Sequence, residues 1–180
     1  LDKSNRNTTK MLARNHQYLG VNEACESYKH RKLKEGKLGV FWHTQGSGKS
    51  DSMVFLSQKI RRKLQGSPTI IILTDRDELN KQISDTFEAC GCLGDVKAST
   101  FIPQSGTHLI QMLKGNPSFI FTLIQKFNNR TPEPIIPDHD ILILSDEAHR
   151  TQHGIFADNM CSLLPTASRL GFTGTPLFTY

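Results

Sequence analysis

Two short strings in the sequence contain the residue types best suited to chemistry. The first is Gly46-Ser47-Gly48-Lys49-Ser50, and the second, about a hundred residues later, is Asp146-Glu147-Ala148-His149. The first is typical of a loop that binds phosphate, and the second places two adjacent carboxylates directly after an apolar run. Together they predict the hydrolysis of a nucleoside triphosphate with the help of a magnesium ion.

The phosphate-binding reading of the first string rests on its glycines and its single cation. Gly46 and Gly48 permit backbone angles that turn successive amides inward around an anion. Lys49 can reach the β- and γ-phosphates of a nucleotide, and Ser50 can ligate magnesium. His43 stands where the full pattern GxxxxGK[ST] has glycine, whereas the second half of that pattern is intact. We expect the nucleotide to be bound by Gln45, Gly46, Ser47, Gly48, Lys49 and Ser50.

Asp146 and Glu147 are adjacent carboxylates, which repel each other unless a cation lies close by. We expect Asp146 to hold magnesium, directly or through water. We expect Glu147 to orient the attacking water and take its proton. The catalytic set predicted from the sequence is Lys49, Asp146 and Glu147. Two solvated carboxylates after a strand are the alternative, which the phosphate-binding string disfavours.

Apolar runs and breaker residues predict the elements that position these strings. We expect strands at 38–42, 69–73, 96–101, 119–123, 141–144 and 169–172, and helices at about 9–34, 49–64, 77–89, 106–114 and 153–164; residues 128–137 are expected to form a loop. Strands that alternate with helices predict a mainly parallel sheet with helices on both faces, a three-layer α/β/α fold. Both strings then follow strand ends, where ligands bind in such sheets.

Other residues give weaker signals. Arg14 and Gln17 precede the loop on the first predicted helix and could hydrogen-bond a base, or could be exposed polar side chains. Arg76, Gln125 and Lys126 lie near strand ends and could face a nucleic-acid backbone, although a lone surface cation is often only solvated. His149 could link the nucleotide site to a neighbouring loop, or could cap and pack.

The composition is that of a globular protein rather than a disordered one. The chain has 180 residues, of which 37% are apolar and 22% charged, and its formal net charge is +5. This basic excess suits a polyanionic partner such as nucleic acid, or only a solvated surface. Cys25, Cys90, Cys92 and Cys161 lack the spacing of a zinc site, so reduced thiols are expected. No apolar run is long enough to span a membrane.

The order of the motifs resembles the first motor domain of superfamily-two helicases and translocases, and most closely the restriction (R) subunit of type I restriction enzymes. The resemblance extends from about residue 10 to 177. It rests on these strings: Arg14-Asn15-His16-Gln17-Tyr18, His43-Thr44-Gln45-Gly46-Ser47-Gly48-Lys49-Ser50, Thr74-Asp75-Arg76-Asp77-Glu78-Leu79, Thr122-Leu123-Ile124-Gln125-Lys126-Phe127, Ser145-Asp146-Glu147-Ala148-His149-Arg150-Thr151-Gln152 and Gly171-Phe172-Thr173-Gly174-Thr175-Pro176.

The resemblance implies a RecA-like, P-loop ATPase fold over residues 1–180 and ATP and Mg²⁺ as cofactors. It implies an ATP-driven translocase of double-stranded DNA, which works with methylation and specificity subunits in the cytoplasm of a bacterium or archaeon and not at a membrane. Arg14 and Gln17 then resemble the adenine-reading motif on a helix over about 9–34. His149, Thr173 and Thr175 resemble residues that couple the nucleotide site to movement.

The resemblance also implies parts that this sequence does not contain. The nuclease domain would precede Leu1 and the second motor domain would follow Tyr180. We therefore expect the chain alone to bind nucleotide, to hydrolyse it poorly and not to cut DNA. A chromatin-remodelling-like or other superfamily-two translocase is the alternative within enzymes. A non-hydrolysing, nucleotide-dependent DNA-binding module is the alternative outside them, although such a module has no need of Glu147.

Overall fold

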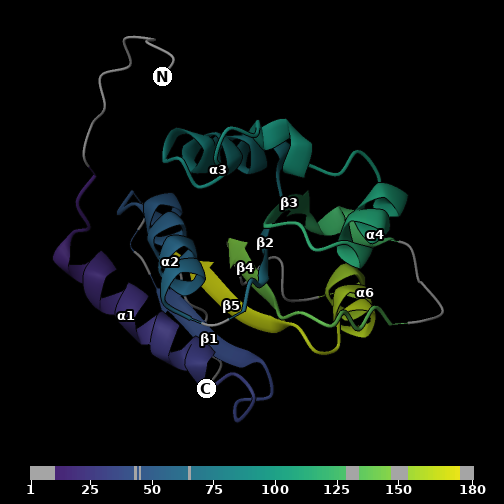
Figure 1. Ribbon diagram of the computed structural model, residues 1–180, viewed down its shortest axis with the longest axis horizontal. Coiled ribbons are helices and arrows are strands. Elements are labelled where there is room, and N and C mark those ends of the chain that lie inside the picture. Colours follow the sequence, from purple (N-terminus) through teal and green to yellow (C-terminus); the bar gives the residue numbers. More distant parts are fainter. Residues whose placement is uncertain are drawn as a thin grey trace.

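The computed structural model describes residues 11–42, 44, 46–64, 66–128, 134–146 and 154–174. Within these residues the fold is a parallel sheet of five strands in the order β1-β5-β4-β2-β3. Helices lie on both faces of the sheet, as Figure 1 shows. The three-layer α/β/α fold predicted from the sequence is confirmed.

The strands are short, and two of the three inner strands of the sheet are completely buried. They are β1 (Lys37–Trp42), β2 (Thr69–Thr74), β3 (Phe119–Leu123), β4 (Ile141–Asp146) and β5 (Ser168–Thr173). Every residue of β2 and β4 is buried. Continuous runs of Ile and Leu are expected in such strands, because both of their faces pack against helices.

The helices are α1 (Asn15–Lys29), α2 (Lys49–Lys63), α3 (Asp77–Ala89), α4 (Gly106–Lys114) and α6 (Ile155–Leu163), with 3₁₀ turns η1 (Ala98–Phe101) and η2 (Ile124–Asn128). Alternate strand residues contact different helices, as a side-chain period of two requires. Ile70 and Ile72 of β2 pack in one core with α1, α2 and α3, whereas Ile71 and Leu73 pack in a second core with α4 and α6.

The sequence located most elements to within a few residues, but one prediction was wrong. Residues 96–101, which were expected to form a strand, form a turn and the 3₁₀ segment η1. The amide of Ala98 donates to Glu88 Oε2 at 2.7 Å, and the ring of Phe101 packs edge-on against Phe119 of β3 with centroids 6.5 Å apart. The apolar residues of this segment therefore cover the core without pairing with the sheet.

The first helix is shorter than predicted. It begins at Asn15 and ends at Lys29, and the basic residues that follow form turns up to Gly36, which has a φ of +73°. Residues 11–14 precede the helix without regular structure. The helix predicted at 153–164 is α6, whose first predicted residue lies outside the described residues, as does half of the loop predicted at 128–137.

Candidate active site

The predicted site residues gather at one edge of the sheet. Because all five strands are parallel, their carboxyl ends lie at the same edge. The phosphate-binding string follows β1, Asp146 ends β4 and Thr173 ends β5, and these three strands are neighbours. Arg76 follows β2 and Gln125 follows β3, which form the other half of the same edge. One half of the edge therefore carries the residues predicted for the nucleotide, and the other half carries the residues predicted for DNA.

The loop before α2 has the backbone shape that its glycines predict. Gly46 and Gly48 have φ angles of +78° and +86°, which side-chain-bearing residues rarely adopt. The amide of Ser47 donates to Thr44 O at 3.1 Å, which closes a tight turn. A Cβ at Gly48 would lie 2.7 Å from Gln17 Nε2, so a side chain there would displace the Gln17 amide. Lys49 then begins α2, so the amides of the first helical turn face the loop.

The central contact of the site joins the two strings. The ammonium of Lys49 lies 3.1 Å from Asp146 Oδ1, although the two residues are about a hundred positions apart in the sequence. The Lys49 side chain is 17% exposed and that of Asp146 is 4% exposed. A carboxylate this buried needs a cation close by. The sequence predicted both residues from separate motifs, and the structure brings them into contact.

These residues fit the cofactors that the sequence predicts. The glycine loop and the start of α2 form a cradle for phosphate, and Lys49 lies beside a buried carboxylate that can serve a divalent cation. No group of three His, Cys, Asp or Glu side chains in the described part of the chain could hold a metal alone. Proteins bind magnesium through one or two carboxylates together with phosphates and water, so Asp146 beside the loop fits this cation. Ser50 lies in the first turn of α2, where the sequence predicted a magnesium ligand.

Gln17 ties the first helix to the phosphate loop. Its Oε1 accepts from the amide of Arg14 at 2.9 Å, and its Nε2 donates to Gly48 O at 3.1 Å. The side chain is buried, although it is polar. The sequence predicted that Arg14 and Gln17 read a base; the structure places Gln17 against the loop and gives it an additional role in fixing the loop, while the Arg14 amide bonds to Gln17 at the start of α1. The base-reading role itself stays a prediction.

Two residues of the site were missed at the level of sequence. His16 Nε2 lies 3.3 Å from Ser47 O, so a second residue of α1 reaches the loop. Trp42 ends β1, and its indole Nε1 donates to Gly174 O at 3.2 Å. This bond joins the strand before the loop to the Thr173-Gly174-Thr175 string. The position of Trp42 could have identified it as a site residue, because this single tryptophan of the sequence directly precedes the loop segment.

Some predicted residues lie outside the described part of the chain. They are Gln45, Glu147, His149 and Thr175. Thr173, by contrast, is buried at the end of β5 and lies opposite Trp42 in the sheet. The roles assigned to Glu147 as base and to His149, Thr173 and Thr175 in coupling stay predictions.

The three residues predicted to contact DNA differ in their exposure and in the hydrogen bonds that they make within the protein. The Arg76 side chain is 63% exposed, with Nε 3.8 Å from Asp75 Oδ2. Gln125 Nε2 donates to Asp75 O at 2.9 Å and so joins the segments that follow β2 and β3. The ammonium of Lys126 donates to Pro103 O. Arg76 therefore presents the most accessible charge of the three.

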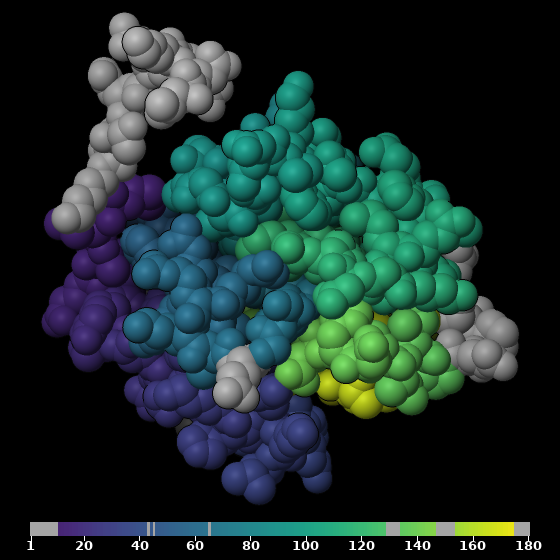
Figure 2. All heavy atoms as spheres, viewed as in Figure 1, coloured from purple at the N-terminus to yellow at the C-terminus, as the bar shows by residue number. Residues whose placement is uncertain are grey.

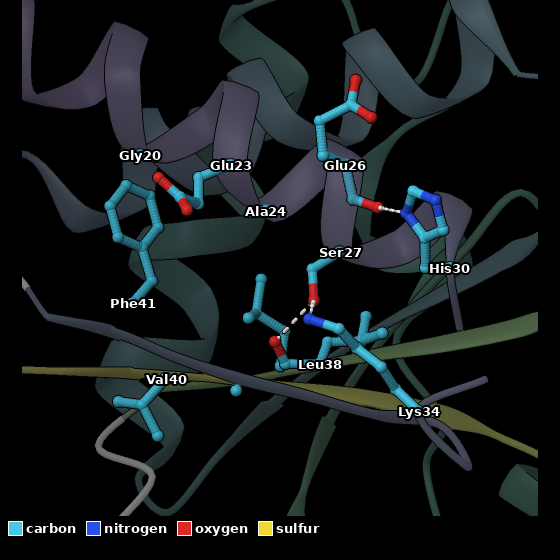
Figure 3. Close-up of a pocket in the computed structure, with 12 residues that line it drawn as sticks. Gly20, Glu23, Ala24, Glu26, Ser27, His30, Lys34, Leu38, Val40 and Phe41 are labelled. Atoms are coloured by element: carbon cyan, nitrogen blue, oxygen red, sulfur yellow. Dashed lines mark hydrogen bonds between the residues drawn. The ribbon is translucent and has the colours of Figure 1, made fainter. Parts of the chain in front are cut away.

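A cavity of about 520 Å³ lies away from this edge, between α1 and β1, and is drawn in Figure 3. Its polar groups bond one another: Ser27 Oγ donates to Leu38 O at 2.7 Å, and Lys34 Nζ donates to Ser27 Oγ at 2.7 Å. None of the residues predicted for the nucleotide site lines it. We therefore infer that the polar groups of this cavity hold α1 against the edge strand β1 and do not bind the nucleotide.

Three of the four cysteines have the character of unreactive thiols. Cys25, Cys90, Cys92 and Cys161 all lie within the described residues, and no disulfide joins them. Burial raises the pKa of the Cys25, Cys90 and Cys92 thiols, which lowers the fraction present as the nucleophilic thiolate. No helix in the described residues is long and apolar enough to cross a membrane.

Comparison with known proteins agrees with this geometry. Residues 16–180 match the family model described as SWI2/SNF2 ATPase. The chain is 38% identical to the type I restriction enzyme HindI endonuclease subunit of Haemophilus influenzae, over 94% of this chain and 18% of that protein. It is 35% identical to the putative type I restriction enzyme MjaIXP endonuclease subunit of Methanocaldococcus jannaschii, over 80% of this chain and 14% of that protein. The chain thus spans less than a fifth of these relatives.

Solved structures show the same fold at low sequence identity. The Sulfolobus solfataricus SWI2/SNF2 ATPase core in complex with dsDNA matches with a TM-score of 0.64 and 16% identity, over 93% of this chain and 33% of that one. A nuclease-deletion mutant of the Type ISP restriction-modification enzyme LlaGI in complex with a DNA substrate mimic matches with a TM-score of 0.61 and 19% identity, over 94% and 18%. The resemblance stated from the motifs is confirmed, and the chain belongs to the SWI2/SNF2 ATPase family, with relatives among type I restriction endonuclease subunits.

Proposed function

We propose that this chain is the ATP-binding motor domain of a type I restriction endonuclease R subunit, which drives ATP-dependent translocation of double-stranded DNA before cleavage. The observation that carries the proposal is the contact of 3.1 Å between Lys49 Nζ and Asp146 Oδ1. A phosphate-binding loop and a buried strand-end carboxylate meet there, as nucleotide hydrolysis requires. The relatives named type I restriction enzyme endonuclease subunits support the choice among families of motor.

ATP and Mg²⁺ are the proposed cofactors, and bound ATP supplies the phosphoanhydride bond whose hydrolysis drives the motor. The amides around Gly46 and Gly48 and the ammonium of Lys49 would hold the phosphates. Ser50 and Asp146 would hold the magnesium. Glu147 would take the proton of the attacking water at a carboxylate oxygen, an assignment that rests on its place next to Asp146 in the sequence.

DNA contact is proposed for the other half of the strand edge. Arg76, Gln125 and Lys126 follow β2 and β3, beside the nucleotide half, and the chain carries a net charge of +5. Contacts from such residues to phosphates hold DNA without reading its sequence. We therefore propose binding to the duplex backbone, in a cytoplasmic complex with methylation and specificity subunits that select the DNA site.

Two alternatives make different predictions about activity. A chromatin-remodelling-like or other superfamily-two translocase would share the ATPase site but not the restriction partners. A non-hydrolysing, nucleotide-dependent DNA-binding module would keep binding and lack turnover. The adjacent carboxylates Asp146 and Glu147 favour hydrolysis over this second alternative, since a module that only binds has no use for a base.

Translocation can be tested in the intact protein with a short third strand bound as a triplex on double-stranded DNA. We expect ATP to drive displacement of that strand, and we expect the Lys49→Ala variant to lose displacement while DNA binding persists without nucleotide. ATP hydrolysis without displacement would exclude the translocase role. If the protein showed no hydrolysis and no displacement, that result would favour the binding module.

A further inference from the structure

A groove between α1 and α2 is lined mainly by residues that the proposed motor function does not use, and Gln17 is the one residue assigned to both. It has a volume of about 320 Å³. Its apolar wall includes Tyr18 and Val21 of α1 and Phe55 of α2. The two helices contact each other, and Figure 2 shows their purple and blue atoms side by side at the surface. The groove lies along the flank of the molecule and extends from Gln17 toward the carboxyl end of α2, away from the phosphate loop.

The charged side chains of this groove all have the same sign. Lys59, Arg62 and Lys63 line it from α2, and among the described residues no carboxylate lines it. The ammonium of Lys59 donates to Asn22 Oδ1, which fixes this charge at the junction of the two helices. The cavity between α1 and β1 is different, because side chains of both signs line it: Glu23 and Glu26 as well as Lys34 (Figure 3). The groove therefore has a specific preference for a negatively charged occupant.

Apolar side chains are unusually exposed on the same stretch of chain. Met11, Leu12, Tyr18 and Leu19 are all exposed, and Tyr18 is 60% exposed although its ring lines the groove. Apolar clusters rimmed by polar residues commonly mark protein–protein contacts. Tyrosine and arginine are also the residue types that most often dominate binding energy in such contacts. An occupant of the groove is thus expected to bring apolar side chains as well as negative charge.

We infer that the α1–α2 groove docks a protein segment that combines Asp or Glu residues with large apolar side chains. The apolar side chains would pack on Tyr18 and Phe55, and the carboxylates would pair with Arg62 and Lys63. A nucleic-acid backbone fits less well, because its hydrated phosphates gain nothing from an apolar wall.

The test is photo-crosslinking in the intact protein and its complex, with p-benzoylphenylalanine in place of Tyr18. We expect crosslinks to a protein segment rich in Asp and Glu. The double charge reversal Arg62→Glu, Lys63→Glu should reduce that crosslink at least tenfold. The matched reversal Lys32→Glu, Lys114→Glu, at exposed lysines outside the groove, should leave it unchanged.

Each other outcome overturns the inference. Crosslinks to DNA would assign the groove to nucleic acid, and crosslinks to a neutral or basic segment would exclude the charge argument. The absence of any crosslink would leave the groove without a partner. Basal ATP hydrolysis is measured in parallel and should be unchanged by the Arg62 and Lys63 reversals, which separates failure of the docking inference from failure of the motor function or of folding.

Discussion

The contact between Lys49 and Asp146 predicts a large and testable effect on stability. Replacing Lys49 by Met keeps most of the side-chain stem and removes the charge, so Asp146 stays buried without its cation. At the 3.1 Å observed, two unit charges interact by about 5 kcal/mol for an effective dielectric constant of 20, before the cost of desolvation. Removal of one partner of a buried pair typically costs about 3–5 kcal/mol. We expect about 3 kcal/mol, because the Lys49 side chain is 17% exposed.

The assay is urea unfolding of the 180-residue chain, followed by circular dichroism and by the fluorescence of Trp42, the only tryptophan. With a slope of about 2 kcal/mol per molar urea, the midpoint should fall by roughly 1.5 M in Lys49→Met. The double variant Lys49→Met, Asp146→Asn should regain about 2 kcal/mol, because the buried charge is then gone. Lys114→Met, at an exposed lysine, serves as the control. A midpoint for Lys49→Met equal to that control, or strictly additive effects in the double variant, would refute the reasoning.

Three further predictions follow from named residues. In the intact protein, Glu147→Gln should retain ATP binding and lose about 100-fold or more in hydrolysis, as expected for loss of a positioned base; normal turnover with DNA present would exclude Glu147 as the base. Reversal of Arg76 and Lys126 to Glu should weaken duplex-stimulated ATP hydrolysis and lower the salt slope of DNA binding by about two, and a Lys114→Glu control with the same loss would remove both residues from the DNA contact. Burial raises the pKa of Tyr28 to about 12. The unfolded tyrosine loses its proton near pH 10, so the folded chain should lose up to about 2.7 kcal/mol of stability between pH 10 and 12, and Tyr28→Phe should flatten this part of the pH–stability curve; an unchanged curve would show that Tyr28 does not cause the loss.

Most of the fold follows from local sequence signals. The helix predicted at 77–89 and the strand predicted at 119–123 agree with α3 and β3, because breaker residues flank a periodic helix and a continuous apolar run. The strand predicted at 96–101 was wrong. Val96 and Phe101 favour a strand locally, but in the folded chain Phe101 packs against Phe119 and the segment does not pair with the sheet. β-propensity depends strongly on such context.

The site likewise contains residues that the sequence could predict and contacts that it could not. Lys49 and Asp146 were predictable, because each lies in a motif whose chemistry requires it. The contacts of Gln17 with Gly48 and of Trp42 with Gly174 were not predictable, because they join segments that only the folded sheet brings together. The hydrogen bond from Lys126 Nζ to Pro103 O is likewise a tertiary contact that no sequence pattern predicts.

The central claim is that the loop ending in Lys49 binds the phosphates of a nucleotide beside Asp146. Titration calorimetry of ATP with Mg²⁺ against the chain and its Lys49→Ala variant tests it most directly, with Lys114→Ala as the control. Loss of a charge-assisted phosphate contact should weaken binding by at least about 2 kcal/mol, roughly 30-fold in affinity, while the control binds like the parent chain. Equal affinity of the Lys49→Ala variant and the parent chain would contradict the assignment of this loop as the nucleotide site.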